Sequence, residues 1–239
     1  MNIFLTGGSG GIGGAIVRLL GKDPTNRIYF TFNQDADSAA ALEREFPSVK
    51  ALRCDLADPA QLEGIKNELA GVDIDAVVNN AFAKLELKNV GQTEWSDVEH
   101  HLAVGVRSSL EFSRAFSRGM KLKKKGAIVT VLSSAVVGTP PPGMAPYLIA
   151  KYALLGVHQA LAADLSPYGV RVNAVSPSMV KTGLLSNVPD HYVNRMEAAA
   201  PGGRLTTPEE VAAAVAYLLS NAAPEVNGAN LTISAAPTP

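Results

Sequence analysis

The sequence predicts an α/β protein in which a doubly wound parallel sheet of about seven strands is flanked by helices. Short β-rich runs alternate with runs of helical spacing along the 239 residues, as is typical of right-handed βαβ units. Several β-rich runs are apolar on successive residues, as expected of strands buried on both faces. A glycine-rich turn directly follows the first strand. No composition shift marks a linker, so we expect a single domain over residues 1–239.

In chain order, each expected element ends at turn residues or at a change of periodicity. The expected strands are 2–6, 27–32, 49–54, 74–79, 127–133, 170–175 and 230–233. The expected helices are 12–20, 38–46, 59–69, 95–120, 146–165 and 208–219. One parallel sheet covered on both faces accommodates all of them.

Composition limits the classes of function. The net charge is −1, so no basic field favours nucleic acid, and no apolar run approaches the roughly 20 residues of a membrane span. The single cysteine, Cys54, agrees with a reducing, cytoplasmic compartment. We expect no nucleic-acid, membrane or metal partner. The lysines at 121 and 123–125 are interpreted as a solvated loop, with a docking patch for an acidic partner as the alternative.

The glycine-rich turn runs from Thr6 to Gly13 and precedes a helix. Glycines let the backbone approach a pyrophosphate, whose charge is stabilised at the helix N-terminus. An ordinary tight turn would also use glycine. The position between the first strand and a helix favours dinucleotide binding.

Polar residues at the ends of the next two strands bear on the cofactor. Asn33 and Gln34 are uncharged and Asp35 lies slightly beyond them. An acidic residue here binds the 2′-OH of NAD, whereas a small polar environment leaves room for the NADP phosphate. The pattern favours NADP, with NAD as the alternative. Asp55 follows the third strand, where it is a candidate acceptor for the adenine amine or a turn cap.

Tyr147 and Lys151 are four residues apart on an expected helix. Residues at this spacing share one helical face. A nearby cation stabilises a phenolate and lowers the tyrosine pKa, which makes the phenol a usable general acid or base. The alternative is a half-exposed aromatic residue beside a solvated charge.

Together these segments resemble the short-chain dehydrogenase/reductase family, which has a Rossmann fold. The resemblance covers nearly the whole chain and rests on order and spacing. Its residues are Thr6, Gly7, Gly11, Gly13, Asp55, Asn79, Asn80, Ala81, Ser134, Tyr147, Lys151, Pro177 and Thr182. The segments 208–220 and 227–234 are similar to the 3-oxoacyl carrier-protein reductase branch.

The resemblance implies a role for each matching residue. Tyr147 passes a proton to or from the substrate oxygen, and Lys151 lowers the tyrosine pKa and holds the nicotinamide ribose. Ser134 orients the carbonyl, with Ser133 as the alternative assignment. The implied cofactor-binding residues are Gly7, Ser9, Ile12, Gly13, Asn33, Asp55, Leu56, Asn79, Ala81, Tyr147, Lys151, Pro177 and Thr182.

The expected function is an NAD(P)-dependent oxidoreductase acting on a small carbonyl or alcohol, with a carrier-bound 3-oxoacyl group or polyketide-type ketone as candidate substrate. One alternative is a dinucleotide-binding homologue that has lost catalysis and acts as a pathway partner. Another is non-redox catalysis by the same residues. The resemblance also implies a substrate lid at about 183–200 and a homodimer or homotetramer.

Four features depart from the family pattern. Phe82 stands where glycine usually follows Asn-Asn-Ala, which puts cofactor access in doubt. Gly105 occupies the place of an asparagine that anchors a water beside the lysine, which threatens the proton relay. His100 and His101 are potential substitutes, but helical spacing predicts that both lie on the surface. Milder departures are Ser178 after Pro177, and Ala235 and Ala236 at the usual Gly-Gly.

Overall fold

The computed structural model describes residues 1–234; Ala235 and Ala236 lie outside the described residues. Within residues 1–234 the strands form a seven-stranded sheet in the order β3-β2-β1-β4-β5-β6-β7, and all pairings are parallel. The strands are β1 (Asn2–Leu5), β2 (Arg27–Phe32), β3 (Val49–Arg53), β4 (Ala76–Asn79), β5 (Gly126–Val131), β6 (Val170–Pro177) and β7 (Asn230–Ile233). The predicted doubly wound α/β sheet is confirmed.

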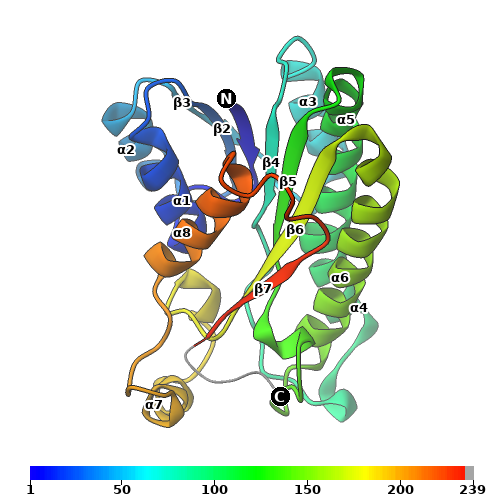
Figure 1. Cartoon of the computed structure of the whole chain (residues 1–239). Coiled ribbons are helices and arrows are strands. Elements are labelled where there is room, and N and C mark those ends of the chain that lie inside the picture. The colour runs from blue at the N-terminus through cyan, green and yellow to red at the C-terminus, as the bar shows by residue number, and fades with distance from the viewer. Residues whose placement is uncertain (235–239) are drawn as a thin grey trace.

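Helices cover both faces of the sheet (Figure 1). One face packs against α1 (Gly11–Gly21), α2 (Ala36–Glu45) and α8 (Pro208–Leu219), the other against α3 (Pro59–Glu68), α5 (Ser108–Lys123) and α6 (Ala145–Leu165). The short helices α4 (Trp95–His101) and α7 (Asp190–Ala199) lie near the carboxyl ends of the strands. Each face has its own apolar cluster, so the central strands are buried on both sides.

Local sequence explains where several helices begin. The Asp35 side chain accepts a hydrogen bond from the Ser38 N–H at the start of α2, and Asp58 accepts from the Ala60 N–H at the start of α3. Thr207 and Glu210 form a reciprocal capping box at the start of α8. Such caps satisfy N–H groups that the first helical turn leaves unpaired.

The helix expected over 95–120 is interrupted. A π-helical segment, Leu102–Arg107, separates α4 from α5. The hydroxyls of Ser108 and Ser109 donate hydrogen bonds to the carbonyls of Val104 and Gly105, one turn earlier. Hydroxyl bonds of this kind bend helices, and single π turns often mark functional sites.

The strand order fixes where a site can form. β1 pairs with both β2 and β4, so the chain changes its direction of winding between these two neighbours. Ligands of open α/β sheets bind outside the carboxyl ends of the strands at such a switch point. None of the helices described in residues 1–234 is long and apolar enough to span a membrane.

Candidate active site

A cleft of about 820 Å³ opens at the carboxyl ends of the strands. It collects Ser134, Tyr147 and Lys151 and nearly all of the residues predicted to bind a cofactor. Two predicted residues do not line it. Gly13 is buried in the first turn of α1, against the Gly7 carbonyl. Asn79 lies beneath the cleft, where its amide donates to the Ser113 hydroxyl at 3.0 Å.

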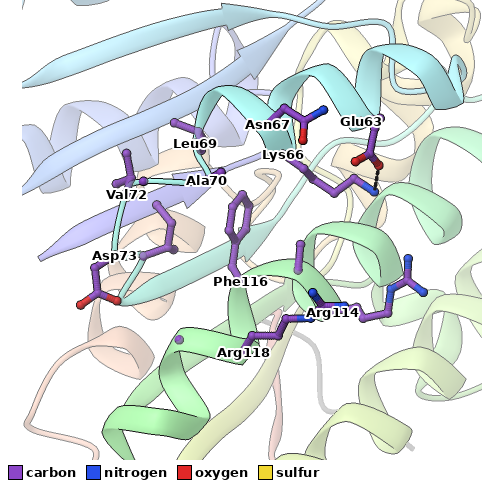
Figure 2. Close-up of a pocket in the computed structure, with 14 residues that line it drawn as sticks. Glu63, Lys66, Asn67, Leu69, Ala70, Val72, Asp73, Arg114, Phe116 and Arg118 are labelled. Atoms are coloured by element: carbon purple, nitrogen blue, oxygen red, sulfur yellow. Dashed lines mark ion pairs between the residues drawn. The ribbon is translucent and has the colours of Figure 1, made fainter.

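A second hollow lies between α3 and α5 and holds none of the predicted site residues (Figure 2). Its most prominent charged group, Lys66, is paired with Glu63 at 2.6 Å and Glu111 at 2.9 Å. Arg114 is paired with Glu111 at 2.8 Å. These ion pairs neutralise much of the charge on the wall of this hollow.

The glycine-rich turn is held in place by both neighbouring strands. Gly7 donates to the Thr31 hydroxyl at 3.1 Å, and the Asn80 amide donates to the carbonyls of Thr6 and Gly7 at 2.9 and 3.0 Å. Gly7 has a φ of +71°, which favours glycine. A Cβ at Gly13 would lie 2.0 Å from the Gly7 carbonyl oxygen. The turn therefore needs glycine at both positions, and it leaves a cradle that fits a pyrophosphate.

Two carboxylates lie at the end of the cleft formed by β2 and β3. Asp35 caps α2, and its other oxygen lies 4.0 Å from where a Gly10 Cβ would be. Asp55 accepts from the Ala57 N–H at 2.9 Å, so the turn-capping interpretation holds for one of its oxygens. The described residues that line this end include no lysine or arginine. Any phosphate placed there would meet negative charge.

α6 carries the central pair of the site. Tyr147 and Lys151 are both buried and lie one turn apart on this helix. The Lys151 ammonium donates to the Val131 carbonyl at 2.9 Å, and no carboxylate of the described residues pairs with it. Burial alone lowers the pKa of Lys151 to about 7. Lysine is thus close to its titration midpoint at neutral pH.

The pKa of Tyr147 differs from the expectation. Burial raises it to about 12, and the hydrogen bond with Ser133 opposes this only in part. The predicted lowering by Lys151 fails in the protein alone, because Nζ lies 5.6 Å from the Tyr147 ring centroid and is held by the β5 carbonyl. Tyr147 is therefore fully protonated at neutral pH, which is the form a general acid requires.

The serine that contacts Tyr147 is Ser133, the alternative assignment, rather than Ser134. Ser133 follows the end of β5 and caps a short 3₁₀ turn, Ser134–Val136, by accepting from the Ala135 N–H. Ser134 is the first residue of that turn and also lines the cleft. Both serines line the cleft, so the assignment of Ser134 to the substrate carbonyl stays a prediction beside the alternative, Ser133.

Phe82 lies at the centre of an aromatic group that the sequence did not predict. Its ring centroid is 4.0 Å from Lys151 Nζ and 5.2 Å from the Tyr147 ring, which it meets edge-on. His101 lies behind it at 5.7 Å between ring centroids. The ring of Phe82 also covers Gly105, where a Cβ would lie only 2.3 Å from it.

His101 is buried, contrary to the predicted surface position, whereas His100 is exposed. The His101 Nδ1 lies 2.9 Å from the Asp97 carbonyl, and burial lowers the pKa of the ring. Val98, His101 and Gly105 are all buried and recur at i, i+3 and i+7. That spacing is the sequence signal that would have placed His101 on the inner face.

The segment after β6 forms the other wall of the cleft. Thr182 lies against the glycine-rich turn, where a Gly11 Cβ would be 3.0 Å from it. Leu185, Val188 and Val193 pack in one cluster with Tyr147. Leu184, Leu185 and Met196 also line the cleft. Side chains of this segment thus both pack against Tyr147 and line the cleft, and Leu185 does both.

Comparison with known proteins agrees with this geometry. A sequence model of a family described as Enoyl-(Acyl carrier protein) reductase matches residues 7–235. A 3-oxoacyl-(acyl-carrier-protein) reductase of Vibrio cholerae is 32% identical, with 97% of this chain and 94% of that protein covered. A meso-2,3-butanediol dehydrogenase of Serratia marcescens is 30% identical, with 99% and 94% covered.

Among solved structures, one similar fold is that of a putative NAD(P)-dependent gluconate 5-dehydrogenase from Beutenbergia cavernae with bound NADP. It has a TM-score of 0.88 and 27% sequence identity, and the match covers 98% of this chain and 94% of that one. The names of these similar proteins thus refer to different alcohol and ketone substrates. The likeness defines the type of reaction more closely than the substrate.

Proposed function

Because the chain belongs to the short-chain dehydrogenase/reductase family, we propose that it reduces a 3-oxoacyl thioester with a nicotinamide dinucleotide as hydride donor. The observation that carries this proposal is the contact of Tyr147 with Ser133 at the cleft, one helical turn from Lys151. Reduced nicotinamide supplies a hydride when it is bound. The residues of the chain have to bind the dinucleotide, orient the ketone and deliver a proton.

The proton comes from Tyr147. Because its pKa is raised to about 12, the phenol carries a proton at neutral pH and donates it as negative charge develops on the ketone oxygen. Ser133 donates a hydrogen bond to the same oxygen, and such a preformed donor is worth more in the transition state than in the ground state. The Lys151 ammonium stabilises the phenolate that remains. A protonated tyrosine suits reduction rather than alcohol oxidation.

The dinucleotide is assigned to the cradle between β1 and α1 and to the neighbouring strand ends. Gly7, Ser9 and Ile12 would contact the diphosphate, with Gly13 keeping the turn open. Asn33, Asp55, Leu56 and Ala81 would lie along the adenosine half, and Pro177 and Thr182 beside the nicotinamide. Asn79, buried at the end of β4 and bonded to Ser113, would support this end of the cleft from beneath. The cofactor is NADP or NAD.

An acyl chain would fit the remaining wall of the cleft. Its apolar lining comes from Leu85, Pro141, Met144, Leu184, Leu185 and Met196. Ligand pockets of this kind combine apolar walls with a few convergent polar groups. Residues of about 183–200 would act as the substrate lid, and the thioester would be presented by a carrier.

Exposed apolar side chains support the proposed homodimer or homotetramer. Leu110 on α5 and Ile149 and Tyr152 on α6 are each more than two-fifths exposed, at 45%, 48% and 46%. Contacts between copies of these helices would cover them. The buried, unpaired Cys54 supports a cytoplasmic protein.

The test is oxidation of NADH or NADPH, followed at the nicotinamide absorbance band, with a short 3-oxoacyl thioester as substrate. We expect consumption of reduced cofactor that depends on the ketone, and no consumption with the matching 2-enoyl thioester. Conversion of substrate without loss of reduced cofactor would indicate non-redox chemistry instead. Cofactor binding without conversion of any ketone would indicate the non-catalytic alternative.

The two serines give a matched pair of variants. Ser133→Ala is expected to lower kcat about a hundredfold, the effect of removing one oxyanion donor, because it is the hydroxyl that reaches Tyr147. Ser134→Ala is expected to change kcat less than about threefold. Both are measured in the ketone assay at saturating cofactor. The reverse order would restore the assignment made from residue spacing.

The choice of cofactor can be shifted at Gly10. Its backbone is extended and its Cβ position is open apart from Asp35 at 4.0 Å. Gly10→Arg adds a cation beside Asp35, so we expect the ratio of NADPH to NADH affinity to rise about tenfold, or about 1.4 kcal/mol. Gly10→Gln, of similar length and without charge, is the control. Fluorescence titration measures both, and an equal change in the two variants would contradict a charge effect.

A further inference from the structure

Three segments far apart in the chain meet at the Phe82 ring. Phe82 follows β4, Gly105 lies in the π-helical segment before α5, and Lys151 lies on α6. The ring centroid is 4.0 Å from Lys151 Nζ, within the range of a cation–π contact. The Cδ2 and Cε2 carbons of the same ring lie against Gly105. Phe82 thus contacts both the lysine and the π-helical segment that contains Gly105.

The contact between Phe82 and Gly105 is sterically matched. A Cβ at Gly105 would lie 2.3 and 2.4 Å from two carbons of the Phe82 ring, far inside van der Waals contact. No side chain therefore fits at position 105 while the ring keeps its place. The buried Gly105 leaves room for the ring, and a restored side chain there would expel it.

The surroundings of Lys151 are nearly free of charge. β5 contributes the Val131 carbonyl, α6 contributes the Tyr147 phenol, and the loop after β4 contributes the Phe82 ring. On α4, behind the ring, lies His101, whose burial favours the neutral form. Two charged side chains of that loop, Lys84 and Glu86, line the cleft, and Glu86 pairs with Lys88.

We propose that Phe82 is a positioning residue for the reaction: its ring, seated in the space that Gly105 leaves, caps the Lys151 ammonium and closes its path to solvent from the α4–α5 side. Lys151 then exchanges protons only through the cofactor cleft. This rests on the proposed function for its kinetic consequence. The cap itself is a property of the folded chain and can be tested without turnover.

The cap has two separable effects on Lys151. The ring face stabilises the ammonium by a cation–π contact, and the bulk of the ring excludes water, which disfavours the ammonium. Phe82→Leu keeps much of the bulk but loses the ring face, so the lysine should titrate at lower pH. Phe82→Gly admits water, so it should titrate at higher pH. Phe82→Tyr keeps both effects and should leave the titration in place.

The experiment is a carbon-13 NMR titration of lysine-labelled protein, with the Lys151 signal identified by its loss in Lys151→Met. We expect opposite shifts for Phe82→Leu and Phe82→Gly, each about one pH unit, and Phe82→Tyr within a few tenths of wild type. Phe116→Leu removes a ring from a different apolar cluster, the one that holds Phe4 and Phe112, and is the control. It should leave the Lys151 titration unchanged.

The coupling to Gly105 is tested in the same titration. Gly105→Ala should displace the ring and raise the pH of the Lys151 titration as Phe82→Gly does, and should add no further shift in the Phe82→Gly background. A titration unchanged in both Phe82→Leu and Gly105→Ala would overturn the cap.

The alkaline limb of the kcat/KM profile should move with the NMR titration. If wild type reduces no ketone, the proposed function fails while the NMR result still decides the cap.

Discussion

Replacing Tyr147 by phenylalanine is expected to lower kcat for ketone reduction by about 10²- to 10⁴-fold, the contribution of a positioned general acid. In the proposed reaction the phenol is the proton donor, and the nearby Ser133 hydroxyl, which would have to lose its own proton, is a far weaker acid. The ring of Tyr147 remains buried among Met144, Leu185 and Val193, so phenylalanine fits the same space. Binding of reduced cofactor, read by fluorescence, should stay within about threefold.

The control for this prediction lies on the same helix. Tyr152 follows Lys151, is 46% exposed and has no role in the proposed chemistry. Tyr152→Phe should keep kcat within about twofold, since exposed substitutions seldom perturb a fold. Retained ketone reduction in Tyr147→Phe would show that another group delivers the proton. His101, buried behind Phe82, would then be the first residue to change.

The layer structure could be predicted from the sequence because alternation and buried apolar runs are local signals. β2, β7 and α8 have the predicted bounds. The break in the helix expected over 95–120 could not be predicted. It depends on Ser108 and Ser109 bonding to carbonyls one turn back and on the packing of Phe82 against Gly105. Those contacts join segments that are distant in sequence.

The sequence predicted which residues meet in the cleft, but not the pKa of Tyr147. One cleft collects the glycine-rich turn, the strand ends, Tyr147 and Lys151, because parallel strands bring their carboxyl ends to one edge of the sheet. The sign of the Tyr147 pKa shift was wrong, since spacing on a helix gives proximity to a cation and not the extent of burial. Residue spacing favoured Ser134, whereas the hydrogen bond to Tyr147 comes from Ser133; both serines line the cleft, so this choice stays a prediction.

Phe82 and Gly105, two departures from the family pattern, are in contact in the folded chain. Considered separately, Gly105 lacks the side chain that would anchor a relay water, and Phe82 threatens access of the cofactor. In the folded chain the ring of one fills the space left by the other. Restoring a side chain at Gly105 alone would collide with Phe82, so the informative comparison changes both positions.

Lys151→Met is expected to stabilise the folded protein while it abolishes efficient turnover. Lys151 is buried as an ammonium with one carbonyl partner, and replacing such a buried charge by an apolar side chain typically gains about 1 to 4 kcal/mol. At pH 6 this should raise Tm by several degrees, measured by calorimetry. In the proposed reaction kcat/KM should fall, because the phenolate and the cofactor ribose would both lose their cation. Lys125→Met, at an exposed position, is the control.

The sign of the pH dependence follows from the lowered pKa of Lys151. Its pKa falls from an unfolded value of 10.5 to about 7 on folding, so between these values the unfolded chain binds more protons. The free energy of unfolding of wild type therefore gains a rising contribution from pH 7 to pH 10.5. The advantage of Lys151→Met should be largest at pH 6 and shrink towards pH 10. An advantage that stayed constant with pH would mean that the lysine is not buried as a charge, and that the site owes its chemistry to something other than a desolvated ammonium.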